Sequence, residues 1–176
     1  MTLYQRILVP VDGSKTSDLG LQEAIRLARV TGGKLRILHV IDDLSFALAL
    51  DAYAGGTGEW LAEMRQQGQK LLDHAVGIAA EAGIQAEGAL RERLAGKLVE
   101  AVVAETTGWP ADLIVLGTHG RRGLGRLMMG SDAEAILRAA TIPVLLVRQP
   151  APEATQEDAP VQASKVSLVT ASLKIE

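Results

Sequence analysis

Short apolar runs alternate along this chain with longer segments whose apolar residues recur at helical spacing. The run Ile7–Val11 predicts a buried strand. Ser14 is placed to cap a helix over 15–31, which Gly32 and Gly33 end. The same patterns predict further strands at 35–41, 84–90, 113–116 and 143–147, and further helices at about 59–82, 94–107 and 131–140.

This alternation predicts an α/β fold, in which right-handed crossovers build an open five-stranded parallel sheet with helices on both faces. The runs 7–11 and 113–116 are wholly apolar and belong in the centre of the sheet. The run 84–90 carries interleaved polar residues and belongs at an edge. We therefore expect the strand order 3-2-1-4-5. The winding reverses between strands 1 and 4, so Asp12 and Gly117, which follow these strands, are expected at the switch point where ligands bind.

Other segments lack this regularity. Residues 42–58 show no clear period and include three glycines, which predicts a long loop or lid. Residues 150–160 have the composition of a linker, whereas 164–175 return to β-prone residues, which indicates either a disordered tail or an added strand. The expected organisation is one domain over 1–149, followed by a linker and tail over 150–176.

Composition and charge narrow the function classes. The net charge of −3 and pI near 5.7 argue against a general nucleic-acid binder. The chain contains no cysteine, which excludes disulfides, thiolate catalysis and cysteine-ligated metals. We expect neither a secretory signal nor a membrane span, because no sufficiently long apolar run occurs, and we expect a cytoplasmic protein.

The candidate chemistry lies in the glycine-rich segment 117–131. Glycines allow backbone N–H groups to approach an anion closely, and a helix is expected to begin at Gly130 and Ser131. The Ser131 hydroxyl is expected either to cap that helix or to donate to a phosphate. The segment lacks the Gly-Lys-Ser/Thr of a Walker A loop and the third glycine of a Rossmann fingerprint. The alternative interpretation is a turn-rich connection without a ligand, just as Asp12 could simply close a turn.

Catalytic and metal-binding residues are not assigned. His119 with Asp12 is the one acid–base pair that an enzyme could use, and no pair of histidines has metal-ligand spacing. We expect His39 to be packed at the end of a strand and His74 to be exposed on a helix.

The pattern Gly117-x2-Gly120-x9-Gly130-Ser131 resembles the universal stress protein family. The opening run 7–14, the strand that contains His39-Val40 and the closing run 143–148 are similar to that family as well. The resemblance covers residues 4–148 and, because every defined position of the glycine motif is present, points to the subgroup that binds ATP. It implies contacts to adenosine and phosphates, with Mg²⁺ as a further option, from Pro10, Val11, Asp12, Val40, Leu116, Gly117, Gly120, Gly130, Ser131 and Asp132.

Within this set, the resemblance makes Asp12 the acceptor for the ribose hydroxyls, Val40 a backbone contact to adenine, and Gly130 with Ser131 part of the phosphate site. Asp132 departs from the family pattern, in which an apolar or small residue is common. Its carboxylate could stabilise the first helical turn, hold Mg²⁺ or repel the phosphates, and we expect the first.

The expected function is that of an ATP-binding stress or regulatory protein with little or no hydrolysis. The family further implies a homodimer formed through the fifth strand. The alternatives are a slow nucleotide hydrolase and a ligand-free dimeric interaction module.

Overall fold

A computed structural model describes residues 3–41, 52–53, 58–92, 97–118 and 130–148. Its strands are β1 (Arg6–Pro10), β2 (Lys34–Ile41), β3 (Ala86–Glu92), β4 (Leu113–Gly117) and β5 (Val144–Val147). Its longer helices are α1 (Lys15–Thr31), α3 (Glu59–Glu81), α4 (Leu98–Gly108) and α5 (Ser131–Ala139). The five strands form one parallel sheet in the order β3-β2-β1-β4-β5, so the predicted fold class and strand order are confirmed.

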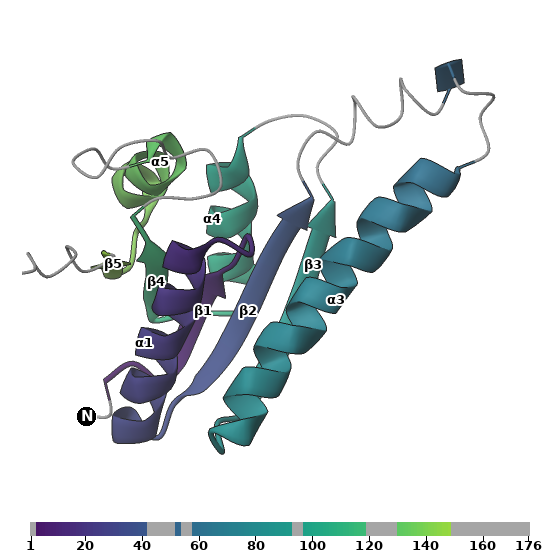
Figure 1. Ribbon diagram of the computed structural model, residues 1–176. Helices are drawn as coiled ribbons and strands as arrows, with labels where there is room; N and C mark the ends of the chain where they lie inside the picture. The colour runs from purple at the N-terminus through teal and green to yellow at the C-terminus, as the bar shows by residue number, and fades with distance from the viewer. Residues whose placement is uncertain (1–2, 42–51, 54–57, 93–96, 119–129, 149–176) are drawn as a thin grey trace, which may run out of the picture.

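Helices cover the two faces of the sheet in pairs (Figure 1). Ile7 and Val9 of β1 pack with α1 and α3 on one face, in a core that also includes Leu21 and Leu72. Leu8, between them in the sequence, packs on the other face with residues of α4 and α5. Adjacent strand residues point to opposite faces, so a central strand covered on both sides must be apolar throughout.

The two ends of α1 match the prediction. The Ser14 hydroxyl accepts a hydrogen bond from the Ser17 amide at 3.2 Å and so caps the helix. The helix ends at Gly32, whose φ of 70° lies in the left-handed region that glycine adopts without steric cost.

Several predicted boundaries were wrong by a few residues. Strand 3 was expected from Ile84, but the Ile84 amide donates to the Ala79 carbonyl at 2.9 Å and completes the end of α3, so β3 begins at Ala86. Helix α4 begins at Leu98, because Lys97 has an extended backbone; residues 93–96 lie outside the described residues. Within the predicted loop 42–58, Ala52 and Tyr53 are helical, and 42–51 and 54–57 also lie outside the described residues.

An ionic cluster around one buried carboxylate joins β2, β3 and α4, and the sequence analysis did not find it. The Glu105 side chain of α4 is only 4% exposed. Its carboxylate accepts from Arg36 Nε at 2.9 Å and from Arg91 Nε at 2.8 Å. Arg36 also pairs with Glu87 at 2.7 Å. Buried charges are stable only when they are paired and hydrogen-bonded, so this cluster fixes α4 against the two strands.

Candidate functional site

The candidate site lies at the carboxyl edge of the sheet, where β1 and β4 are neighbours. Their pairing covers Ile7↔Leu113 and Leu8↔Ile114 and stops two residues before β1 ends at Pro10. The chain leaves β1 toward α1 on one face, and it leaves β4 toward α5 on the other face. This is the switch point of a doubly wound sheet, where both connections leave an opening for a ligand.

Gly117, at the end of β4, lies against the first turn of α1. A Cβ built on Gly117 would come within 2.5 Å of the Thr16 carbonyl oxygen, and one built on Gly20 would lie 3.3 Å from the Gly117 amide nitrogen. The glycine at this position of the motif is therefore required by packing, whether or not a ligand binds.

The two ends of the glycine-rich segment meet at the edge of β4. The Thr118 amide donates to the Val147 carbonyl at 2.9 Å, and the Gly130 amide donates to the Thr118 carbonyl at 2.7 Å. Gly130 is thereby held beside the end of β4. Gly120 and His119, the other residues of interest in this segment, lie outside the described residues, as does all of 119–129.

Helix α5 spans Ser131–Ala139 with Gly130 as its N-cap, so the first of the two roles expected for Ser131, capping this helix, was wrong. The Gly130 carbonyl accepts the first helical hydrogen bond, from Glu134 at 3.0 Å, which places Ser131 inside the helix as its first residue. Glycine has no side chain to cap the helix, so the first amides of α5, including those of Ser131 and Asp132, have no partner within the helix. Both side chains are exposed, and Asp132 adds its charge to the first turn.

Asp12 occupies the turn between β1 and α1. Its Oδ1 accepts from the Ser14 amide at 3.0 Å, so Asp12 does close a turn. The neighbouring Val11 side chain is 6% exposed and packs in the core under α1 and α3, while the Leu116 side chain packs in the opposite core. Of the predicted contact residues, Val11 and Leu116 can therefore offer a ligand only their backbones.

Val40, near the end of β2, directs its backbone toward this opening. The Lys34 amide donates to Gln5, and the Leu38 carbonyl accepts from Val11, so even-numbered residues of β2 point their polar groups toward β1. The pairing of β1 with β2 ends at Pro10↔Leu38. The amide and carbonyl of Val40 consequently face the space beyond the end of the β1 ladder.

An exposed ion pair joins α3 to the same edge of the sheet. Arg65 Nε and Nη2 donate to the Glu92 carboxylate at 2.7 and 2.9 Å. These hydrogen bonds hold the pKa of Glu92 below its ordinary value and raise the pKa of Arg65. The pair therefore contributes stability above the ordinary pKa of a glutamate, and that contribution is lost as the pH falls through the lowered pKa of Glu92.

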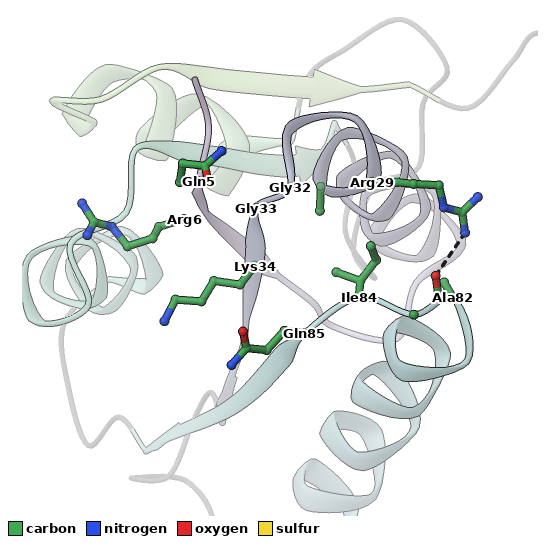
Figure 2. Close-up of a pocket in the computed structure, with 11 residues that line it drawn as sticks. Gln5, Arg6, Arg29, Gly32, Gly33, Lys34, Ala82, Ile84 and Gln85 are labelled. Carbon is green, nitrogen blue, oxygen red and sulfur yellow. Dashed lines mark hydrogen bonds between the residues drawn. The ribbon is translucent and has the colours of Figure 1, made fainter. Parts of the chain in front are cut away.

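A depression of about 670 Å³ lies at the opposite, amino-terminal edge of the sheet (Figure 2). Arg29 points across it and donates to the Ala82 carbonyl at 3.3 Å, and the Lys34 ammonium lies 5.7 Å from the centre of the Trp109 ring. The C-terminal ends of α1 and α3 lie here, and their carbonyl groups disfavour an anion. The carboxyl edge of the sheet is therefore the better candidate for an anion-binding site.

The whole described region matches one known family. A family model for the universal stress protein family matches residues 3–148. The chain belongs to that family. The universal stress protein MJ0531 of Methanocaldococcus jannaschii is 33% identical over 152 residues, which cover 86% of this chain and 86% of that protein.

Solved structures of universal stress proteins share the fold. The Archaeoglobus fulgidus protein in complex with dAMP matches with a TM-score of 0.59 and 22% identity, over 84% of this chain and 99% of that chain. A universal stress protein in complex with cAMP matches with a TM-score of 0.58 and 24% identity, over 84% and 99%.

Metal-binding clusters and membrane spans were also sought. Over 3–41, 52–53, 58–92, 97–118 and 130–148, no three His, Asp or Glu side chains gather as a metal site would require. Among the helices of the same residues, none combines the length and apolar character needed to cross a bilayer.

Proposed function

We propose that this universal stress protein binds an adenine nucleotide, with ATP and its Mg²⁺ ion as the preferred form, at the carboxyl edge between β2, β1 and β4. Binding would act as a regulatory signal in a stress response, with little or no hydrolysis. The observation that carries the proposal is the 2.7 Å hydrogen bond from Gly130 to Thr118, which sets the uncapped start of α5 beside the switch point.

Each part of a nucleotide has a matching group at this edge. The first amides of α5 and the positive end of its dipole suit a phosphate. Asp12 follows β1, and we propose that its carboxylate accepts from the ribose hydroxyls. The Val40 amide and carbonyl offer one donor and one acceptor, which suits the edge of adenine. The dAMP and cAMP complexes of two relatives support an adenine ligand.

Calorimetric titration with ATP and Mg²⁺ tests this proposal. We expect saturable binding by the natural protein, and Gly130→Val should weaken it about tenfold or more, because a branched side chain would stand where the phosphate approaches the backbone. Phosphate release measured in the same samples tests for hydrolysis. If the natural protein binds no nucleotide, the proposal is wrong.

A second variant separates the charge of Asp12 from its role in the turn. Asp12→Asn keeps an oxygen that accepts from Ser14 but removes the negative charge, so we expect about tenfold weaker ATP binding with an unchanged melting temperature. Asp73→Asn, on the exposed side of α3, is the matched control and should bind normally. Equal affinity of the two variants would remove Asp12 from the site.

We also propose a homodimer through β5. Among the strands of the described residues, β5 pairs with β4 alone, and Leu145 is 36% exposed. The carbonyls of Pro143 and Val147 accept from β4, so by alternation the polar groups of Val144 and Leu146 face the open edge of the sheet. An open, partly apolar edge is a surface on which a second copy can add its own strand.

Sedimentation velocity tests the dimer. Leu145→Lys is expected to shift a dimer to monomer, because it sets like charges near each other across a two-fold axis. Val30→Lys adds the same charge at a site that is 85% exposed on α1 and should leave the dimer intact. A natural protein that sediments as a monomer at high concentration would contradict the proposal.

A further inference from the structure

His39, on β2, ends the pairing between β1 and β2 one step early. The Val11 amide donates to the Leu38 carbonyl at 2.8 Å, as in a regular parallel ladder. The next bond of such a ladder would run from the Val40 amide to the Val11 carbonyl. The Val11 carbonyl instead contacts His39 Nδ1 at 2.8 Å, and the paired residues stop at Pro10↔Leu38.

The hydrogen bond to the Val11 carbonyl determines which nitrogen of the His39 ring carries a proton. A backbone carbonyl can only accept, so Nδ1 must carry a proton. A neutral His39 is then the Nδ1–H tautomer, and its Nε2 is left as an acceptor.

The fold makes room for this ring. Gly68 is buried in α3, where a glycine in mid-helix is less favourable than alanine. A Cβ on Gly68 would lie 3.1 Å from His39 Cδ2 and 3.0 Å from Leu90 Cδ1. Because Gly68 has no side chain, α3 can pack closely on the sheet while the half-buried His39 ring stays between this helix and the turn after β1.

We propose that His39 is a positioning residue for the base of the nucleotide, an inference that rests on the proposed function. By occupying the Val11 carbonyl, its side chain keeps the Val40 amide out of the ladder. Among the described residues, no hydrogen bond joins that amide to Val11. The Val40 N–H and C=O can then pair with a ring nitrogen and the exocyclic amine of adenine. Hypoxanthine carries a carbonyl in place of that amine, so the arrangement selects ATP over ITP.

Amide exchange measured by NMR tests, without a ligand, whether His39 keeps the Val40 amide out of the ladder. The Val40 amide of the natural protein should exchange faster than the amides paired within β2. His39→Leu frees the Val11 carbonyl, so we expect the ladder to extend and the exchange of Val40 to slow by about tenfold. His39→Asn should keep fast exchange, because its amide nitrogen can donate from near the position of Nδ1. A purely structural role would speed exchange across the sheet instead.

The ratio of ATP to ITP affinity tests whether the Val40 backbone groups select adenine over hypoxanthine. We expect His39→Leu to weaken ATP by about tenfold and to bring the ratio close to one, whereas His39→Asn restores most of the preference. His74→Leu, at an exposed histidine of α3, is the matched control.

The results that would contradict this inference can be distinguished from those that would contradict the proposed function. A slowly exchanging Val40 amide in the natural protein overturns the inference, and this measurement needs no variant to fold. An unchanged ratio of ATP to ITP affinity in His39→Leu also overturns it. If the natural protein binds no nucleotide while Val40 slows as expected in His39→Leu, then the proposed function fails and His39 is left as the residue that ends the ladder.

Discussion

Glu105→Gln is expected to lower the free energy of unfolding by about 3 kcal/mol. The Glu105 carboxylate, 4% exposed, accepts from both Arg36 and Arg91. Glutamine is neutral and turns an N–H₂ group toward one of the two guanidinium groups, so both arginines lose their ion pair with residue 105, and Arg36 keeps only Glu87. The expected loss is at the lower end of the range for buried pairs, because Arg91 is 46% exposed and water can reach it.

Urea denaturation followed by circular dichroism measures this loss. The control is Glu134→Gln, which breaks an exposed pair between neighbouring turns of α5 and should cost less than about 0.5 kcal/mol. A loss below about 1 kcal/mol for Glu105→Gln would mean that the cluster contributes little to stability.

Gly117→Ala is expected to destabilise the ligand-free protein by about 3 kcal/mol. The added Cβ would lie 2.5 Å from the Thr16 carbonyl oxygen and 2.6 Å from its carbon. Backbone atoms cannot rotate away as a side chain can, so α1 or the end of β4 must move. The same movement would displace the turn that contains Asp12.

Gly77→Ala is the matched control for Gly117→Ala. Gly77 lies within α3, and a Cβ there would meet nothing within 4 Å, so alanine should raise stability by about 1 kcal/mol. If Gly117→Ala kept normal stability and lost only nucleotide binding, the ligand rather than packing would explain that glycine.

Much of the fold could be predicted because its causes are local. Ser14 and Gly32 define the ends of α1 through a side-chain cap and a left-handed turn. Both features can be predicted from the residue type alone. The apolar runs of β1 and β4 predicted central strands, and the polar residues of β3 predicted an edge. The strand order then follows from the handedness of crossovers.

The errors at element ends have a common cause. Val11 was predicted within the first strand, but the His39 side chain takes its carbonyl, and β1 ends at Pro10. Capping of α5 was one of the two roles expected for Ser131, but Gly130 already accepts the first helical bond. In both cases a hydrogen bond decided the boundary, and its partner could not be identified from residue types.

The sequence by itself determined the fold class, the strand order, the family resemblance and the edge of the sheet at which Asp12, Gly117 and Gly130 gather. These properties depend on periodicity, turn chemistry and topology, which can be inferred from the order of the residues. Only the tertiary structure showed that Glu105 lies buried between two arginines, that Gly117 is needed against α1, and that His39 ends a ladder beside Val40. Each of these depends on atoms from different elements meeting within a few ångströms, and no pattern within one segment carries that information.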